Sequence, residues 1–244
     1  GDAGHMDVGL WALVSEDGLR WSAPRDLGLA IIPNHGPERM QSGRLLISGN
    51  TMYPYTDDPS GLSGWTPSWI HSGPGCHARP DDSEQFTEAA REAGLSVAVC
   101  EGSWYETDDR VLHLLLRSNT PRLWACESRD GGATWSAPER TDFSDDGSKF
   151  HCGRLPDGRF YVVGNPVPGG GRCPLVVSIS GDGVSFDRHY CLAAEPYARR
   201  AAGMHKGGQY GYPHTLVRDG WLCVIVSRCK EAVQVLRVRI EDLD

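Results

Sequence analysis

The sequence has no apolar stretch that approaches the ~18 residues of a membrane-spanning helix. Basic residues are also few: 24 lysines and arginines stand against 32 acidic residues, which gives a net charge of −8. The chain therefore lacks the basic face that nucleic-acid binding usually requires, and we expect neither a nucleic-acid partner nor a membrane span. A small anionic ligand stays compatible with this charge, because a local cluster of arginines binds such a ligand inside an acidic protein.

Motifs for metal binding and redox chemistry are missing as well. None of the eight cysteines forms a C-x-x-C pair and none of the nine histidines forms an H-x-x-x-H pair, so no metal site and no other cofactor is predicted. Several cysteines lie in apolar runs such as WLCVIVSRC, where we expect buried free thiols. Unpaired cysteines favour a reducing compartment and hence a cytoplasmic location. No signal peptide is visible, but the chain begins without an initiator methionine, so we expect the true N-terminus to be missing.

Glycine and proline, by contrast, are abundant, with 30 and 16 residues in a chain of 244. Their placement between short apolar runs is typical of an all-β architecture with many turns. Strands are predicted over 44–50, 159–165, 221–227 and 232–238. One helix is predicted near 82–94 because capping residues open this segment and a glycine closes it, and we interpret it as an insertion. The length suits one large core, so residues 1–244 are predicted to form a single domain.

A repeat decides the fold class. Its shared form is a serine, an aspartate, one or two glycines and an aromatic residue. The copies are SEDGLRW at 15–21, SRDGGATW at 128–135 and SGDGVSF at 180–186, after the apolar runs LWALVS, RLWACES and PLVVSIS. This composition predicts a turn between two strands. The aspartate accepts backbone N–H groups, the glycine takes a positive φ, and the aromatic residue folds back onto the sheet.

The repeat resembles the Asp-box, or BNR repeat, of the sialidase (neuraminidase) superfamily. This resemblance implies an all-β, sialidase-like β-propeller with six blades when it is complete. The turns and strands of this chain account for about four to five blades. We therefore expect the N-terminal part of the first blade or blades to be missing.

The resemblance extends to the active site of the superfamily. There, three arginines hold the carboxylate of the sugar, a tyrosine polarised by a glutamate attacks the anomeric carbon, and an aspartate is the general acid/base. Glu101, Arg117 and Arg172 match the glutamate and the second and third arginines by their places relative to strands and turns. The segments GYPHTL at 211–216 and DAGHMD at 2–7 make Tyr212 the candidate nucleophile and Asp2 the candidate acid/base. The first arginine of the triad would lie upstream of residue 1.

Each candidate also has a purely structural interpretation. Glu101 and Arg117 suit a surface ion pair, and Asp2 lies at a ragged chain end. Arg172 suits a charged loop after three glycines, and Tyr212 suits a packed core tyrosine. The functional interpretation is favoured because the candidates follow the order of the superfamily. In a propeller the inner strands converge on one central site, where arginines grip a carboxylate with two parallel hydrogen bonds.

The sequence departs from the superfamily after Tyr212, where Pro213-His214 replaces the expected serine. Further histidines, His35 and His151, precede strands. A histidine, tyrosine and arginine set suits β-elimination at a uronate, as in ulvan-type polysaccharide lyases, with Tyr105 and Arg117 as the other members. The complete predicted substrate-binding set is Arg117, Arg172, His35, Tyr105, His151, Arg154, Lys206 and His214.

Three functions follow from these patterns. The first is a sialidase-like glycoside hydrolase that cleaves a terminal sugar of the sialic-acid type from glycans. The second is a polysaccharide lyase of the same fold. The third is a glycan-binding propeller without catalysis, since one fold hosts several functions. In each case the predicted partner is an acidic glycan or oligosaccharide.

Overall fold

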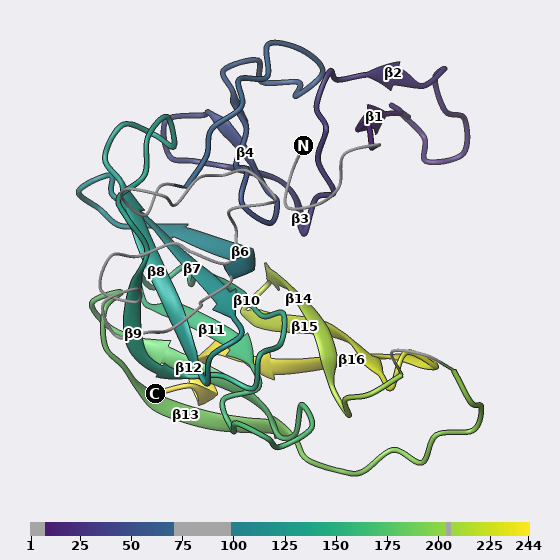
Figure 1. The fold of residues 1–244 in the computed structure, drawn as a ribbon, viewed down its shortest axis with the longest axis vertical. Helices are drawn as coiled ribbons and strands as arrows, with labels where there is room; N and C mark the ends of the chain where they lie inside the picture. The colour runs from purple at the N-terminus through teal and green to yellow at the C-terminus, as the bar shows by residue number, and fades with distance from the viewer. Residues whose placement is uncertain (1–7, 71–98, 204–205) are drawn as a thin grey trace. The chain divides into compact units, whose positions relative to one another are not determined.

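The structure, a computed structural model, describes residues 8–70, 99–203 and 206–244. The described residues form five sheets, and the strands of each sheet follow one another along the chain (Figure 1). The all-β class predicted from the sequence is confirmed. The number of blades stays a prediction. Within the described ranges, no helix has both the length and the apolar character needed to cross a membrane.

The chain divides into two compact units. Unit 1 comprises Gly1–Glu101, Asp108–Leu112 and Cys126–Pro138, and unit 2 comprises Gly102–Thr107, His113–Ala125 and Glu139–Asp244. Two predictions, the helix near 82–94 and the acid/base residue Asp2, lie outside the described residues. The prediction of a single domain stays a prediction.

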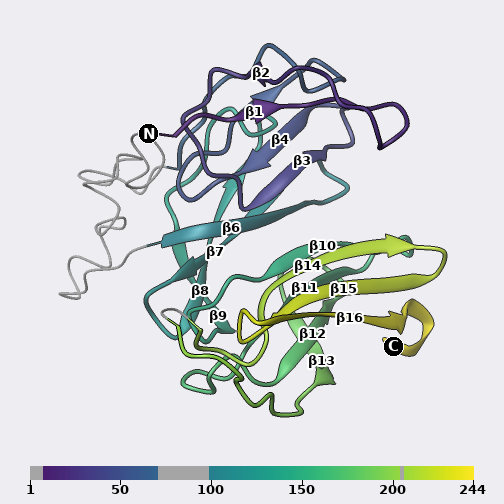
Figure 2. The same cartoon turned by 90° about the vertical axis from the view of Figure 1, so that its right-hand side faces the viewer.

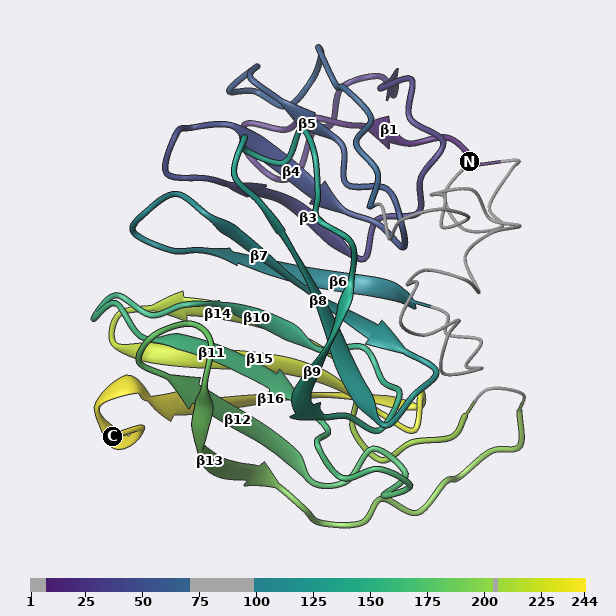
Figure 3. The ribbon, with the colours of Figure 1, turned by 60° about the vertical axis from the view of Figure 1, so that its left-hand side comes forward.

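Unit 1 contains a three-stranded sheet and a short two-stranded pair. Their strands are β1 (Trp11–Ala12), β2 (Arg25–Asp26), β3 (His35–Arg39), β4 (Leu45–Ser48) and β5 (Tyr55–Thr56). Strand β4 is buried along its whole length and lies between β3 and β5 (Figure 3). A register shift between His35 and Glu38 places Pro37 at an irregularity of the β3–β4 ladder, where a missing N–H is tolerated.

A four-stranded sheet contributes residues to both units. Its strands, in spatial order, are β6 (Val99–Glu106), β7 (Leu112–Ser118), β8 (Arg122–Ser128) and β9 (Glu139–Ser144). The leucines at 114–116 of β7 are buried. Arg117 follows them directly and is the next-to-last residue of the strand.

Unit 2 also contains two complete antiparallel sheets. The first is built from β10 (His151–Arg154), β11 (Phe160–Gly164), β12 (Leu175–Ser180) and β13 (Phe186–Ala193), and the second from β14 (Gly211–Arg218), β15 (Trp221–Arg228) and β16 (Ala232–Arg239). Strand β12 is buried at every residue, whereas β16 alternates between half-buried and exposed residues. Inner strands that are covered on both faces and half-exposed edge strands show these two patterns. The strands predicted over 159–165, 221–227 and 232–238 are confirmed.

Hydrophobic clusters join the sheets of unit 2. Strands β11, β12 and β15 lie close together in the ribbon (Figure 2). Tyr161 and Val163 of β11 and Val177 of β12 pack in one cluster with Leu222 and Val224 of β15. All five side chains are at most 4% exposed. Because β11, β12 and β15 are fixed by this core, the loops at their ends are carried on a rigid support.

The three repeated turns share one hydrogen-bond arrangement. In each turn the serine hydroxyl donates to the aspartate and accepts the N–H of a glycine with positive φ. The aspartate accepts further backbone N–H groups: Asp17 from Arg20 and Leu19, Asp130 from Thr134, and Asp182 from Ser185 and Val184. These N–H groups hold the pKa of Asp17 and of Asp182 below the usual value. The predicted roles of the aspartate and the glycine are confirmed, whereas Trp21, the aromatic residue of the first copy, is 61% exposed and is not folded into the core.

Replacing Asp130 by alanine tests the contribution of the turn to stability. The carboxylate accepts the Thr134 N–H at 2.9 Å and the Thr134 hydroxyl at 2.6 Å. Since each hydrogen bond contributes about 1 kcal/mol net, we expect Asp130→Ala to lower the free energy of unfolding by about 1–2 kcal/mol in urea denaturation. The control is Asp142→Ala, an exposed position on β9, with an expected change below about 0.5 kcal/mol. An equal loss of unfolding free energy in the two variants would show that the hydrogen bonds of Asp130 do not stabilise the protein.

Two predictions about the apolar runs are wrong in part. The run LWALVS forms only the two-residue strand β1, because Trp11, Leu13 and Val14 are about half exposed and gain little from burial. The cysteines are also less uniformly buried than predicted. Cys126 and Cys152 are buried, but Cys191 on the outer strand β13 is exposed.

Candidate functional site

A cavity of about 570 Å³ opens within unit 2. Its lining residues are Arg117, Asp146, Gly147, Gly169, Gly171, Arg172, Gly207, Gly208, Tyr212 and Lys230. Three residues predicted from the sequence, Arg117, Arg172 and Tyr212, therefore share one cavity although they lie far apart along the chain. Three of the lining side chains are cationic, and one, Asp146, is acidic.

Backbone geometry sets three of the predicted residues apart. Glu101, Arg172 and Tyr212 have φ angles of 49°, 60° and 58°, a region that residues other than glycine rarely adopt. Such strain persists only where the surrounding structure imposes it, and it gathers at functional sites. Arg172 lies in the loop between β11 and β12. The other residues of this kind in the described ranges also lie in loops between consecutive strands, and they are Arg110, Asp219, Cys229 and Lys230.

The loop that carries Arg172 is held by Asp146. One carboxylate oxygen of Asp146 accepts the N–H of Gly169 at 2.6 Å, and the other accepts the N–H of Arg172 at 2.5 Å. The carbonyl of Arg172 accepts hydrogen bonds from the N–H of Tyr210 and the side-chain amide of Asn165, both at 3.0 Å. Because the backbone of Arg172 is fixed on both sides, the side chain is positioned before any ligand arrives.

Two glycines leave room for the Arg172 side chain. A Cβ atom at Gly208 would lie 2.5 Å from Cδ of Arg172, and a Cβ atom at Gly211 would lie 2.9 Å from its Nη1. Arg172 thus packs directly on the backbone of 208–211, which leads into Tyr212. The two predicted residues are held against each other by this contact.

Tyr212 lies near the start of β14, within the register shift between Gly211 and His214. A bulge of this kind redirects a side chain away from its regular place in the ladder. Three cations lie around the ring of Tyr212. The distances to the ring centroid are 5.1 Å from Lys230 Nζ, 5.3 Å from Arg172 Cζ and 5.9 Å from Lys149 Nζ. The positive charges of these three side chains attract an anionic ligand to the phenol group.

Arg117 also lines a second cavity of unit 2, of about 280 Å³, together with Asn119, Thr120 and Asp145. The Asp145 side chain is buried, at 2% exposure. Burial raises the pKa of the Asp145 carboxyl to about 7, although the N–H of Ser148 and the charge of Arg117 act in the opposite direction. At neutral pH a carboxyl that is only partly charged therefore lies beside the predicted carboxylate-binding arginine.

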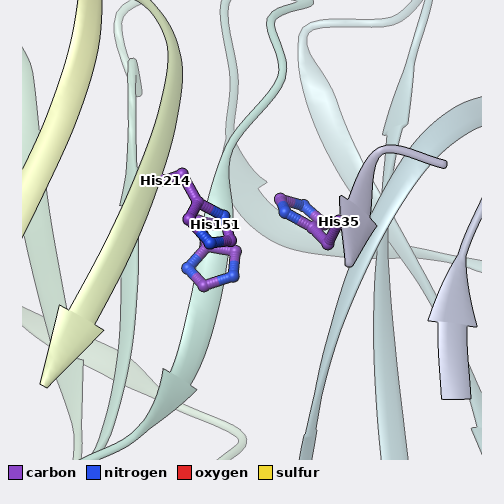
Figure 4. Close-up of side chains that lie close together, drawn as sticks. All are labelled: His35, His151 and His214. Carbon is purple, nitrogen blue, oxygen red and sulfur yellow. The ribbon is translucent and has the colours of Figure 1, made fainter. Parts of the chain in front are cut away.

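A separate polar cluster lies inside unit 2. Nδ1 of His151 lies 2.5 Å from the Thr215 hydroxyl oxygen, and the Tyr161 hydroxyl oxygen lies 2.7 Å from the same atom. The ring of His214 lies beside that of His151, with centroids 4.3 Å apart (Figure 4).

Three predicted substrate-binding residues of unit 2 have structural contacts away from the cavity lining. Tyr105 is 4% exposed and its hydroxyl donates to the Gly183 carbonyl at 2.5 Å. Arg154 donates to the Gly158 carbonyl at 3.3 Å. Lys206 forms an ion pair with Glu231 at 3.1 Å. We therefore leave all three out of the proposed site.

Two further predicted residues belong to unit 1. His35 is the first residue of β3 and is buried at 2% exposure. Glu101 lies in β6 and is half-buried. It is the last residue of the segment Gly1–Glu101 of unit 1. The predicted roles of both residues stay predictions.

Sequence reasoning missed Lys230, Lys149, Asp145 and Asp146 as parts of the site. One signal for Lys230 is present in the sequence: it follows Cys229 in the β15–β16 turn, and both residues have positive φ. Asparagine and glycine usually occupy such positions, so cysteine and lysine there are unusual. The role of Asp146 depends on contacts with a loop more than 20 residues away, which no local pattern reveals.

The model of the BNR repeat-like domain matches residues 3–224. The chain belongs to the BNR repeat-like domain family. No curated protein sequence matches this family member.

Solved structures show that this BNR repeat-like chain has the sialidase-superfamily fold. A mutant of the NanB sialidase from Streptococcus pneumoniae is 18% identical, with a TM-score of 0.66 over 97% of this chain and 36% of that one. The leech intramolecular trans-sialidase, complexed with 2,7-anhydro-Neu5Ac, is 14% identical, with a TM-score of 0.68 over 96% and 37%. The intramolecular trans-sialidase from Ruminococcus gnavus, in complex with oseltamivir carboxylate, is 15% identical, with a TM-score of 0.64 over 93% and 49%. The chain spans less than half the length of these relatives.

Proposed function

We propose that this protein is a sialidase-like glycoside hydrolase that cleaves a terminal acidic sugar from glycans. The observation that carries the proposal is the shared cavity of Arg117, Arg172 and Tyr212. Two guanidinium groups match the planar geometry of one carboxylate, and a phenol oxygen beside them suits attack on the adjacent carbon. The positive φ angles of Arg172 and Tyr212 support the same assignment.

In the proposed reaction, Arg117 and Arg172 bind the carboxylate of the sugar. The phenol oxygen of Tyr212 forms a bond to the anomeric carbon while the bond to the leaving oxygen breaks. The phenol proton passes to Glu101, and the predicted acid, Asp2, gives a proton to the leaving group. Water then attacks the anomeric carbon and gives a proton to the Asp2 carboxylate, while the bond to Tyr212 breaks and the phenolate takes its proton back from Glu101. The chemical reason for a tyrosine is that a neutral nucleophile is repelled less by the substrate carboxylate than an anionic one.

The relatives support this proposal by what their names state. They are a sialidase and two intramolecular trans-sialidases, one of them bound to a sialic-acid derivative. Because identity is 14–18% and the chain covers 36–49% of their lengths, activity in this protein needs its own test.

A lyase of the same fold is the second candidate. The neighbouring rings of His151 and His214 favour it, because β-elimination needs a group that removes a proton. Against it, the hydroxyl of Tyr105 is already bonded to the Gly183 carbonyl, so the predicted tyrosine of the lyase set is engaged. A related protein that binds glycans without turnover is the third candidate.

Turnover of a fluorogenic sialoside tests the proposed function. We expect the protein to release free sialic acid. Arg172→Lys should lower kcat/KM about 100-fold, because an ammonium cannot form two parallel hydrogen bonds with the carboxylate. The matched control is Arg218→Lys at the exposed last residue of β14, which should leave kcat/KM unchanged. An ultraviolet-absorbing unsaturated uronate as product would instead identify a lyase, and glycan binding without turnover would identify a binding protein.

A further inference from the structure

One buried side-chain amide connects two loops that line the cavity. Asn165 directly follows strand β11 and is 1% exposed. Its amide nitrogen donates to the carbonyl oxygens of Arg172 at 3.0 Å and of Pro174 at 3.1 Å, and its amide oxygen accepts the hydroxyl of Ser148 at 2.9 Å. Carbonyl oxygens accept hydrogen bonds and cannot donate them, so the neighbours of the amide require this orientation. The amide therefore holds together two segments that are distant along the chain.

The first loop lies between β9 and β10 and is attached to the end of the strand that carries Arg117. The N–H of Asp145 donates to the carbonyl of Pro121 at 3.2 Å, in the turn between β7 and β8. A Cβ atom at Gly147 would lie 3.6 Å from the carbonyl oxygen of Ser118, the residue after Arg117. The place of this loop is therefore fixed relative to the end of β7.

The second loop lies between β11 and β12 and carries Arg172. Asp146 of the first loop accepts the N–H groups of Gly169 and Arg172, and its own N–H donates to the carbonyl of Asn165 at 2.9 Å. Asn165 then holds the carbonyl of Arg172 from the end of a strand that is buried along its whole length. The φ angle of 60° at Arg172 is a conformation that needs such support. Through Asn165, the backbone of Arg172 is bonded both to a rigid strand and to the loop attached beside Arg117.

We propose that Asn165 is a positioning residue that sets the spacing between Arg117 and Arg172, so that both guanidinium groups reach one carboxylate. This inference rests on the proposed function, in which these two arginines bind the carboxylate of the sugar. Asn165 is not among the residues that line the cavity, and it acts through the backbone of Arg172. A displacement of about 1 Å is sufficient to lose a hydrogen bond to the carboxylate, because the distances of such bonds span only about 0.5 Å.

Binding of a sugar acid and of its uncharged ester tests the inference. The ligands are N-acetylneuraminic acid and its methyl ester, and titration calorimetry with the full chain measures the Kd of each. In wild type the Kd of the acid should be at least about tenfold lower than that of the ester, because the ester lacks the charge that the arginines bind. In Asn165→Ala the Kd of the acid should rise about tenfold, whereas the Kd of the ester should change by less than about twofold.

A double-mutant cycle distinguishes positioning from a general loss of stability. In the Arg172→Lys background the addition of Asn165→Ala should change the Kd of the acid by less than about twofold, because Asn165 acts through Arg172. The control is Thr141→Val in β9, which removes a hydroxyl that donates to the Leu123 carbonyl at 2.8 Å. This variant loses a comparable hydrogen bond and should keep the wild-type ratio of the two Kd values.

Asn165→Asp is a second variant, with nearly the same shape as wild type. Its carboxylate can still accept the Ser148 hydroxyl, but it cannot donate to the carbonyls of Arg172 and Pro174. At neutral pH it should lose the preference for the acid as Asn165→Ala does. At about pH 5 the preference should partly return, because burial favours a protonated carboxyl that donates one hydrogen bond. Near-ultraviolet circular dichroism reports whether each variant is folded.

Each other result overturns a stated part of the proposal. A wild type that binds the acid no better than the ester overturns both the proposed function and this inference. A wild-type ratio of the two Kd values in Asn165→Ala and Asn165→Asp overturns the positioning role and leaves the proposed function standing. An equally large effect of Asn165→Ala in the Arg172→Lys background, or a loss of preference in Thr141→Val, also overturns that role. Failure of both Asn165 variants to fold would make Asn165 a residue of the core instead.

Discussion

Tyr212→Phe is expected to reduce kcat on a fluorogenic sialoside by at least about 1000-fold, while the Kd for N-acetylneuraminic acid changes by less than about threefold. The substitution removes only the oxygen that would form the covalent bond. The ring, its contacts with Arg172 and Lys230, and the arginines that hold the carboxylate all remain. Steady-state kinetics and titration calorimetry on the same preparation measure the two quantities.

The matched control for this variant is Tyr197→Phe. Tyr197 is another half-buried tyrosine of unit 2, its ring also lies near arginines, and it does not line the cavity. Its kcat should equal that of wild type. A Tyr212→Phe enzyme that keeps more than about a tenth of wild-type kcat would exclude the phenol oxygen as nucleophile. Parallel losses of kcat and binding would instead make Tyr212 a binding residue.

Asp145→Asn is expected to stabilise the protein at neutral pH by up to about 4 kcal/mol. The pKa of the Asp145 carboxyl is about 7 in the folded protein, because burial disfavours its charged form, against 3.8 as its ordinary value. Asparagine has nearly the same shape and can still accept the Ser148 N–H, but it never becomes charged. The variant therefore removes the cost of a buried charge without creating a cavity.

The sign of this effect depends on pH. Below about pH 4 the carboxyl is protonated in both the folded and the unfolded chain, so wild type and Asp145→Asn should differ little. Between pH 4 and pH 7 only the unfolded chain ionises, and the free energy of unfolding of wild type should fall relative to the variant by about 1.4 kcal/mol per pH unit. Above pH 7 both states are charged and the difference should stay constant.

Urea denaturation of wild type and Asp145→Asn at several pH values between 4 and 8.5 measures this difference. Asp142→Asn, an exposed residue of β9, is the control and should show no comparable slope. A difference between wild type and Asp145→Asn that is independent of pH would show that the buried carboxyl does not titrate in this range.

Local sequence signals predicted most of the strands and the turns between them. The Ser-Asp-Gly order is sufficient for a turn because all its hydrogen-bond partners lie within a few residues, as Asp182 and Gly183 illustrate. Strand β12 was predictable because an apolar run directly before such a turn has few alternatives. The run that yielded β1 had the same appearance, but its side chains stay exposed, and burial is not a local property.

The residues of the site also divide into those that local sequence signals predicted and those whose place depends on contacts with distant segments. The order of Arg117, Arg172 and Tyr212 along strands and turns followed the superfamily pattern, and all three line one cavity. Tyr105 was assigned to the substrate as the tyrosine of the lyase set, yet its hydroxyl bonds to a carbonyl 78 residues further along the chain. The burial of Asp145 also depends on several distant segments. Such pairings are invisible without the tertiary structure.

The glycines that accommodate Arg172 have a consequence for how this family varies. A β-carbon at 208 or 211 would overlap the side chain of Arg172, so these three positions are not independent. Members that keep the arginine are expected to keep the glycine at 208, whose positive φ also favours glycine, and a side chain at 211 would require the movable end of the arginine to shift. Co-variation of the three positions would thus mark, in a set of sequences alone, which members have retained the anion-binding site and which have kept only the propeller scaffold.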